Sequence, residues 1–309
     1  MHKLTQKILD GHKLSIAKGI TAVENNFPDS LQLLEELFPY TTKSVRIGIT
    51  GPPGAGKSTL TNELAKTLRL LGKTVGIVAV DPSSQYSGGA ILGDRIRMSE
   101  LFGDSGIFIR SMATRGSLGG LSLKAKEVGD VLAASGKDVV IYETVGVGQS
   151  ELEIVKASDT VVVVLVPEAG DSIQAMKSGL MEIADIFVVN KSDREGSERF
   201  CINLQSVLEI RLKSMDWIPP VLKTVALKSE GIDELSKNIL AHSEFLKKNN
   251  ILEIKKAKQN ENKINEIVES ELIKFYRNSD LSKKTLEQNE SPYAKANEIL
   301  EEIFKRLES

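Results

Sequence analysis

The chain has little of what disulfides, metal centres and membrane spans require. Its 309 residues include one cysteine, Cys201, and three scattered histidines. A single cysteine cannot form an internal disulfide, and the histidines give no ligand spacing. The longest apolar run, residues 160–167, is much shorter than the roughly 20 residues that cross a bilayer, and the amino terminus lacks an apolar signal core. We therefore expect no membrane association and a cytoplasmic protein, or an organelle matrix protein if the natural chain starts earlier.

Neither charge sign dominates the chain. Forty basic and 42 acidic side chains give a formal net charge of −2. Without a basic field, the charge gives no reason to expect nucleic-acid binding. The length allows one large domain with appendages or two small domains, and a composition of 41% hydrophobic and 27% charged residues is that of a globular protein.

The strongest motif occupies residues 45–59, where an apolar stretch leads into a glycine-rich turn and then a helical pattern. Gly51, four further residues, Gly56, Lys57 and Ser58 satisfy the phosphate-loop pattern. Backbone N–H groups must wrap closely around a polyphosphate, and glycines leave room for this. Lys57 can reach the outer phosphates and the Ser58 hydroxyl can ligate Mg²⁺. We predict phosphate binding by Gly51, Pro52, Pro53, Gly54, Ala55, Gly56, Lys57, Ser58 and Thr59.

A second motif indicates which base is bound. An apolar stretch from residue 186 ends in Asn190-Lys191-Ser-Asp193. The Asp193 carboxylate can accept hydrogen bonds from guanine N1–H and the 2-amino group, whereas adenine would leave it desolvated and unpaired. Asn190 would brace the loop, and Lys191 would lay its stem over the purine. A solvated turn also explains such a tetrapeptide, but downstream of a phosphate loop the motif favours GTP over ATP.

Short apolar stretches alternate with amphipathic ones along the middle of the chain. This alternation predicts an α/β fold with a doubly wound, mostly parallel sheet of the P-loop NTPase type, with ligands at the carboxyl ends of the strands. We expect a helical segment over residues 1–44, a nucleotide-binding domain over 45–245, and a helical extension over 246–309. The strands are expected near residues 45–50, 74–80, 107–110, 138–142, 160–166, 186–190 and 221–225.

Helical spacing is clear in both terminal segments. At the amino end, apolar residues predict one helix from Leu4 through Val23, and Ser30 is a candidate N-cap for a second helix over 31–38. At the carboxyl end, Ile and Leu recur at helical spacing among Lys, Glu and Asn. These last helices either pack on the main domain or form a dimerisation arm.

Acidic residues at two further strand ends suit a metal site. Asp81 ends one apolar stretch, and Glu143 begins a Glu-Thr-Val-Gly segment with the form of the Mg²⁺/γ-phosphate segment of GTPases. Gly146 can offer its N–H to the γ-phosphate. The next residue, often a glutamine that orients water, is Val147, so we expect slow intrinsic hydrolysis. Asp94 lies in a glycine-rich loop and is either a phosphate or metal contact or a helix N-cap.

Five features occur together in one order: Asp81-Pro-Ser-Ser, a Gly-Gly-x-x-x-Gly-Asp94 loop, Glu143-Thr-Val-Gly-Val-Gly-Gln-Ser-Glu, Gly170-Asp171 to Lys177 with its following Gly-Leu-Met-Glu-Ile-Ala-Asp, and Asn190-Lys-x-Asp193. In this combination, over about residues 1–245, the chain resembles the MeaB/ArgK-type GTPases, relatives of the methylmalonyl-aciduria type A protein. The resemblance implies a homodimeric, Mg²⁺-dependent GTPase that cycles between GTP and GDP. Its client would be an adenosylcobalamin-dependent acyl-CoA mutase, usually methylmalonyl-CoA mutase, for which it gates cofactor loading and gives protection.

The resemblance also implies residue roles. Asp81, Asp94 and Glu143 would serve the Mg²⁺ and hydrolysis site, and Asp171 and Lys177 would act in a switch loop that couples nucleotide state to the mutase. Val225, Ala226 and Leu227 would bring a backbone N–H against guanine O6, although the family usually has Ser where this chain has Val225.

Two other classes share parts of this pattern. A transport-linked ATPase or kinase of the lysine/arginine/ornithine type would prefer ATP, which the Asn190–Asp193 segment argues against. A nickel-insertion GTPase would have a similar core, but the sequence offers no His/Cys cluster for the metal. A scaffold that binds GTP without turnover is a third alternative, because Val147 cannot polarise water.

Overall fold

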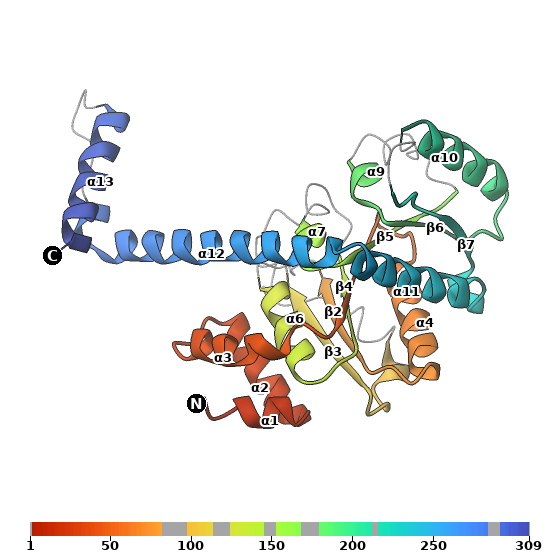
Figure 1. Cartoon of the computed structure of the whole chain (residues 1–309), viewed down its shortest axis with the longest axis horizontal. Coiled ribbons are helices and arrows are strands. Elements are labelled where there is room, and N and C mark those ends of the chain that lie inside the picture. Colours follow the sequence, from red (N-terminus) through yellow and green to blue (C-terminus); the bar gives the residue numbers. More distant parts are fainter. Residues whose placement is uncertain are drawn as a thin grey trace. The chain divides into compact units, whose positions relative to one another are not determined.

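The computed structural model describes residues 2–81, 98–113, 124–144, 153–167, 179–211, 216–283 and 291–308. These residues separate into two compact units, Met1–Leu252 and Glu253–Ser309. The first unit contains the sheet and the helices around it (Figure 1). Within the described residues, no helix combines the length and apolar character that crossing a membrane requires.

The centre of the first unit is a sheet whose described strands all pair in parallel, in the order β3-β2-β4-β1-β5-β6-β7. The strands are β1 (Val45–Thr50), β2 (Val75–Asp81), β3 (Ile107–Ala113), β4 (Val139–Glu143), β5 (Thr160–Leu165), β6 (Ile186–Asn190) and β7 (Val221–Thr224). The predicted doubly wound sheet is confirmed. The chain leaves β1 toward β2 on one side and later returns to β5 on its other side, and such a reversal of strand order is where α/β sheets bind ligands, at the carboxyl end of β1.

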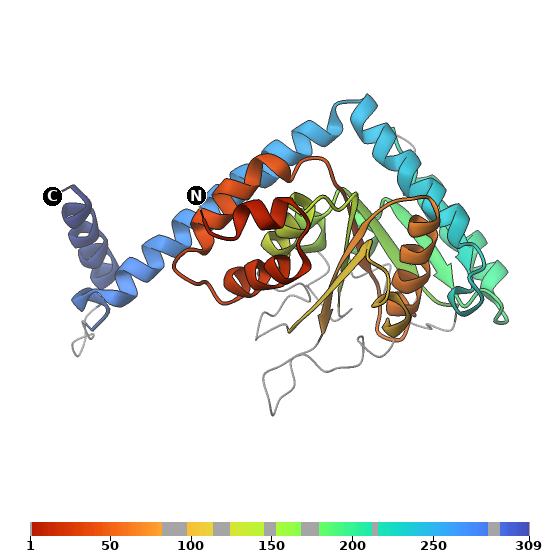
Figure 2. The same ribbon diagram turned by 90° about the horizontal axis from the view of Figure 1, so that it is seen from below.

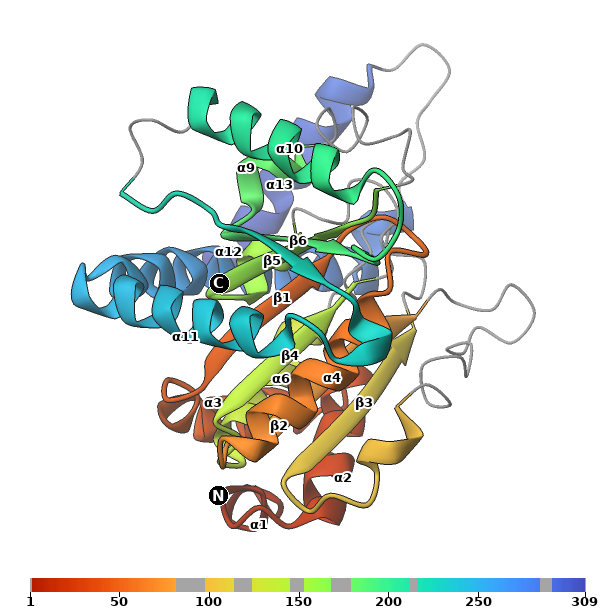
Figure 3. The ribbon, with the colours of Figure 1, turned by 90° about the vertical axis from the view of Figure 1, so that its right-hand side faces the viewer.

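Alternate residues of each strand enter different hydrophobic cores because successive side chains point to opposite faces. Val162 and Val164 belong to the core beneath α4 and α11, and Val161 and Val163 belong to a core on the other face. Figures 2 and 3 show α4 and α11 together on one side of the sheet. The surrounding helices are α4 (Lys57–Leu70), α6 (Ala125–Ala134), α7 (Glu153–Ala157), α9 (Leu180–Ile183), α10 (Ser197–Arg211) and α11 (Ile232–Lys248).

The amino-terminal helices α1 (Thr5–Leu9), α2 (Lys13–Glu24) and α3 (Ser30–Leu37) pack with α6 on the face opposite α4 (Figure 2). The prediction of one continuous helix over 4–23 is wrong, because Gly11 takes a left-handed φ of +75° and separates α1 from α2. Ser30 is not the N-cap of α3 either. It is the first helical residue, and Asp29 occupies the cap position with its carboxylate bound to His2.

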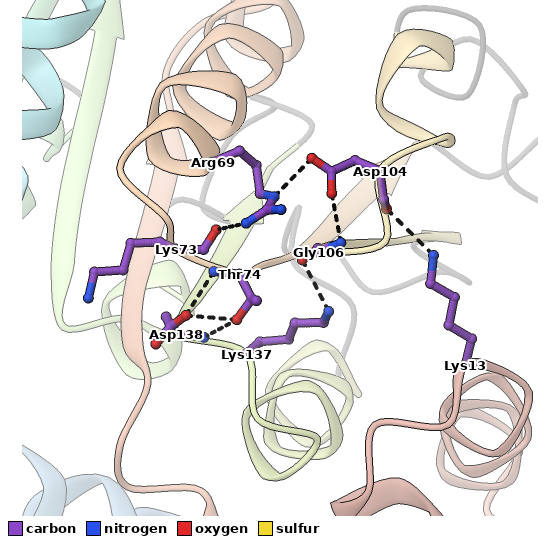
Figure 4. Close-up of polar contacts among 8 residues, drawn as sticks. All are labelled: Lys13, Arg69, Lys73, Thr74, Asp104, Gly106, Lys137 and Asp138. Carbon is purple, nitrogen blue, oxygen red and sulfur yellow. Dashed lines mark hydrogen bonds and ion pairs between the residues drawn. The ribbon is translucent and has the colours of Figure 1, made fainter.

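A polar network joins the amino-terminal ends of the strands, opposite their carboxyl ends (Figure 4). Arg69 Nε at the end of α4 donates to Asp104 Oδ2 at 2.9 Å, and Lys137 Nζ before β4 donates to Gly106 O at 3.1 Å before β3. Burial, followed by repulsion from Lys13 and Arg69, lowers the pKa of the Lys137 ammonium. The network therefore joins the end of α4 and the residues before β4 to the residues before β3.

The second unit contains most of α12 (Ile251–Asn278), a 3₁₀ turn over Asp280–Lys283 and α13 (Pro292–Glu308). Arg306 Nη1 on α13 donates to Asp280 Oδ1 at 2.7 Å, and Leu281 and Ile303 are buried. Both helices match the helical pattern of the sequence.

Candidate nucleotide-binding site

The glycine-rich turn between β1 and α4, residues 51–56, is called the phosphate turn below. It is compact at both ends. Gly51 has a φ of +136°, and a Cβ there would lie 2.1 Å from the Val164 carbonyl oxygen of β5. Gly56 has a φ of +88°, and a Cβ there would lie 2.4 Å from Asn190 Nδ2. A Cβ would clash at either position, so glycine is required at both, and a turn of this kind lets backbone N–H groups approach an anion.

Lys57 begins α4 and its ammonium group is held inside this turn. Its Nζ donates to Gly51 O at 2.8 Å and to Pro52 O at 3.1 Å. The side chain is buried, and a buried ammonium needs such partners. The turn therefore combines a positive charge with a helix amino terminus, which is the environment that phosphate groups favour.

Asn190, at the carboxyl end of β6, joins this turn to a second loop. Its Nδ2 donates to Ala55 O at 2.8 Å, while Oδ1 accepts from Thr224 Oγ1 and from the Ala226 N–H, both at 3.1 Å. The amide is 3% exposed. Its three bonds fix the phosphate turn, the end of β6 and the loop after β7 with respect to one another.

The next residues complete the second loop. Lys191 takes a left-handed φ of +57°, and its Nζ donates to Gly54 O at 2.8 Å. The Asp193 side chain is 44% exposed, and its Oδ2 lies 3.5 Å from Lys228 Nζ. Its carboxylate is thus at the surface and accessible to a ligand. The Asn190 side chain, by contrast, is buried and hydrogen-bonded within the protein.

The tripeptide after β7 is arranged by its backbone. Val225 N–H donates to Glu230 O at 3.1 Å, Ala226 is buried and Leu227 is 88% exposed. Because the Ala226 N–H also faces Asn190 Oδ1, the tripeptide and the Asn190–Asp193 segment form one loop cluster. The cluster stands beside the phosphate turn, where a base attached to bound phosphates would lie.

Glu143 ends β4 next to the first turn of α4. Its Oε1 accepts a 2.6 Å hydrogen bond from Ser58 Oγ, and both side chains are buried. A carboxylate and a hydroxyl meeting at the phosphate turn are hard oxygen donors, and this donor set fits Mg²⁺. Asp81 ends β2, which pairs with β4 through Ala79 and Glu143, so the backbone brings Asp81 to the same edge.

Other predicted site residues lie outside the described residues. They are Asp94, Gly146, Asp171 and Lys177, together with Val147. Among the described residues, the structure brings together the phosphate turn, Ser58 with Glu143, and the loops that carry Asn190 and Ala226.

Two neighbours of these residues did not emerge from the sequence. Thr224 bonds Asn190 and is its partner in the β6–β7 register, and Lys228 faces Asp193. The register offers the only signal for Thr224: once β6 and β7 are placed side by side, their last residues must meet.

Comparisons with known proteins agree with this geometry. A sequence model of the family described as "Methylmalonyl Co-A mutase-associated GTPase MeaB" matches residues 16–280. A putative GTPase of Pyrococcus abyssi is 44% identical over 312 residues, covering 98% of this chain and 96% of the relative. The GTPase ArgK of Escherichia coli is 41% identical over 238 residues, covering 74% and 72%.

A solved structure is similar over nearly the whole chain. The crystal structure of a protein named LAO/AO transport system kinase superposes with a TM-score of 0.73 at 30% sequence identity, and the match covers 97% of this chain and 96% of the other.

Proposed function

Because the chain belongs to the MeaB family of GTPases, we propose that it uses GTP hydrolysis to control an adenosylcobalamin-dependent acyl-CoA mutase, with methylmalonyl-CoA mutase as the first candidate. The family name supports this client, since it describes a methylmalonyl-CoA mutase-associated GTPase. The output would be gated cofactor loading and protection of the mutase. The nucleotide assignment depends above all on the bond between Asn190 and Ala55, which unites the phosphate turn with the base-recognition loop.

In this proposal the phosphate turn supplies charge and orientation. Backbone N–H groups from Gly51 to Thr59 would surround the phosphates, and Lys57 would exchange its bonds to the turn carbonyls for bonds to phosphate oxygens. The ammonium is already at the turn, so little reorganisation is needed when ligand binds. Preorganised charge of this kind stabilises a transferring phosphoryl group.

The metal would be held by residues from the ends of β2 and β4, from the first turn of α4 and from the segment that carries Asp94. Ser58 and Glu143 fit Mg²⁺ by the oxygen donors described above, and Asp81 and Asp94 would complete the set with water between. Bound there, the ion would neutralise charge on the phosphoryl group. Glu143 also accepts the hydrogen bond that the Ser58 hydroxyl donates, which orients that hydroxyl.

Guanine selection would fall to Asp193. Its exposed carboxylate can accept from guanine N1–H and the 2-amino group, while Lys191 packs its stem against the purine. Ala226, with Val225 and Leu227 on either side, would offer its backbone N–H to guanine O6. That N–H donates to Asn190 Oδ1 in this structure. On binding, it would either divide its hydrogen bond between Asn190 and the base or turn toward the base.

Switching would depend on the segments that carry Gly146, Asp171 and Lys177. Gly146 would respond to the γ-phosphate, and the loop with Asp171 and Lys177 would report the nucleotide state to the mutase. With Val147 in the usual glutamine position, the chain would hydrolyse GTP slowly until its partner binds.

The carboxyl-terminal helices would pair two copies of the chain. No described side chain of α12 is buried, although large apolar residues recur along it three or four positions apart. Exposed apolar stripes of this kind mark protein interfaces. They comprise Ile264, Ile267, Val268, Leu272 and Phe275. A light-scattering mass equal to one chain would contradict this part of the proposal.

The test is phosphate release from GTP and from ATP, measured alone and with a cobalamin-dependent acyl-CoA mutase. We expect slow, Mg²⁺-dependent turnover that is selective for GTP and rises when the mutase is added. Lys57→Ala should lose turnover under both conditions, which shows that the signal belongs to this site. GTP turnover that ignores the mutase would overturn the client assignment. A preference for ATP would instead favour the kinase alternative that the name of the solved relative suggests.

A further inference from the structure

A pocket of about 560 Å³ lies within the amino-terminal helices and shares no residue with the nucleotide site. It is lined by the residues before α1, by α1, by α2 and by the connection between α2 and α3. Leu4, Ala17, Ala22 and Phe27 supply apolar surface. Phe27 is 48% exposed, so its ring is partly open to solvent at the pocket. The volume is that of a site for a small ligand or an inserted side chain.

The fixed polar groups of the pocket are already hydrogen-bonded inside the protein. His2 Nδ1 accepts from the Leu4 N–H at 3.2 Å, and His2 Nε2 lies 3.0 Å from Asp29 Oδ2. The hydrogen bond from His2 lowers the pKa of the Asp29 carboxyl. Thr21 Oγ1 donates to Ala17 O at 3.0 Å. The interior therefore has few free polar groups with which to orient a small polar molecule, and it suits an apolar side chain.

Positive charge surrounds this apolar interior. Lys3, Lys7 and Lys18 all line the pocket and are exposed. Among the residues that the structure describes, none of these three ammonium groups has a hydrogen-bond or ion-pair partner. Asp29, the one carboxylate among the described lining residues, bonds His2 and also attracts the Lys3 ammonium electrostatically, so the lining keeps a net positive charge. The three lysines are flexible, so they attract negative charge without dictating one geometry.

We propose that this pocket docks an acidic segment of a partner protein, with one apolar side chain seated between Leu4, Ala17 and Phe27. Carboxylates on either side of that anchor would meet Lys3, Lys7 and Lys18. An apolar centre with a charged rim is the usual anatomy of a protein interface. Flexible cations around the centre give fast, salt-dependent association with a chain of opposite charge. A rigid small anion would find no fixed donor here.

In the experiment, a library of displayed random twelve-residue peptides is selected for binding to the full-length protein. Peptides that also bind the Lys3→Glu/Lys7→Glu/Lys18→Glu variant are removed. Selected peptides are then labelled, and their affinities are measured by fluorescence anisotropy. We expect enrichment of sequences with clustered Asp or Glu around a large apolar residue. Their binding should weaken about tenfold or more in the triple variant and as the salt concentration rises.

Two further variants separate shape from charge. Ala17→Leu keeps every charge but fills the pocket from α2, and it should weaken the selected peptides severalfold. Lys43→Glu/Lys237→Glu/Lys247→Glu changes three exposed lysines elsewhere in the first unit and should leave peptide affinity within about twofold of wild type. GTP turnover should stay near wild type in all three variants, because none of these residues belongs to the nucleotide site.

Several results would overturn the proposal. One is the absence of any enrichment over the triple variant, and another is enrichment of peptides without acidic residues. Equal losses of peptide affinity in the Lys3→Glu/Lys7→Glu/Lys18→Glu variant and in the remote lysine variant would mean unspecific charge attraction. The last measurement is calorimetry with inorganic phosphate and with ADP. If either anion binds saturably to wild type but not to Ala17→Leu, and no peptide binds, the pocket is a small-anion site instead. Because turnover is read separately, these failures are distinct from a failure of the GTPase proposal.

Discussion

Asn190 Nδ2 donates a 2.8 Å hydrogen bond to the carbonyl oxygen of Ala55, which precedes it by 135 residues. Asn190 is the last residue of β6, and Ala55 belongs to the glycine-rich turn after β1. In the parallel sheet both strand ends lie at the same edge, so a single side chain can span them. The position of the segment after β6 is thereby fixed relative to the glycine-rich turn after β1, as the proposed nucleotide site requires.

Replacing Asn190 should therefore damage both stability and binding. Asn190→Ala removes three hydrogen bonds and leaves buried partners unsatisfied, so we expect a loss of about 2–4 kcal/mol in the free energy of unfolding. GTP affinity should fall with it. Thr224→Val removes one of the three bonds and serves as a graded control, with a loss of about 1 kcal/mol. Urea denaturation and nucleotide titration measure both effects. Equal losses in the two variants would contradict the bridging role.

Two glycines of the phosphate turn provide a matched steric test. Both Gly51 and Gly54 have positive φ, so alanine brings backbone strain at each. At Gly54 the new Cβ meets nothing within 4 Å, whereas at Gly51 it meets backbone atoms of Val164. We expect Gly54→Ala to cost about 1 kcal/mol and Gly51→Ala more than about 3 kcal/mol. Thermal and urea unfolding measure this difference, and similar costs would show that the turn can move away from β5.

Glu143 and Ser58 allow a test of the proposed metal site. Glu143→Gln keeps the side-chain volume and an acceptor for Ser58 Oγ, but removes the negative charge. We expect GTP turnover to fall about a hundredfold, and the Mg²⁺ concentration for half-maximal rate to rise. Glu100→Gln, which changes an exposed carboxylate paired with Lys66, should leave both quantities unchanged. Turnover that survives in Glu143→Gln with its Mg²⁺ dependence intact would exclude Glu143 as a metal ligand.

The sheet could be predicted from the sequence because its strands are short, apolar and separated by helical patterns. All seven expected strands are present, and Val161 to Val164 show why: a strand covered on both faces is apolar at every position. The amino-terminal helices were harder to divide. Gly11 sits inside an otherwise continuous helical pattern, and only its positive φ shows that it ends α1.

The sequence could predict where glycine is required in the candidate site, because the close approach of backbone to a phosphate restricts the residue types allowed there. Gly51 and Gly56 are examples, since each faces another part of the chain at a distance no Cβ tolerates. Contacts that join distant segments were not predictable in the same way. The partner of Asn190 at Thr224 depends on the β6–β7 register, and the Asp193–Lys228 pair depends on the path of the loop after β7.

Glu36 should make the amino-terminal helices sensitive to acid. Hydrogen bonds from Thr5 Oγ1 and the His2 N–H lower the pKa of its carboxyl from 4.5 to about 2. A lowered pKa in the folded state means that the ionised group stabilises the fold above pH 4.5 and that this stability disappears as the pH falls toward 2. We expect the melting temperature of wild type to exceed that of Glu36→Gln at pH 6, with the difference shrinking between pH 4.5 and 2.

Glu35 supplies the control for that experiment, because it is an exposed carboxylate on the same helix. Glu35→Gln should follow the wild-type melting curve at each pH more closely than Glu36→Gln does. If the Glu36→Gln difference stayed constant from pH 6 to pH 2, the bonds to Thr5 and His2 would not favour the ionised form.

Replacing one carboxylate oxygen of Asp193 with an amide nitrogen should change which purine base the protein accepts. Guanine presents two donors, N1–H and the 2-amino group, to a carboxylate, whereas xanthine presents N1–H and the C2 carbonyl, which match the two ends of an amide. Asp193→Asn should therefore weaken GTP binding by about a hundredfold or more and improve binding of xanthosine triphosphate. Lys228→Ala removes the cation 3.5 Å from Asp193 but keeps the carboxylate, so it should retain the preference for GTP. Competition titrations with the two triphosphates measure both variants. If Asp193→Asn still prefers GTP as strongly as wild type, the base is read elsewhere, and the backbone of Ala226 becomes the next residue to test.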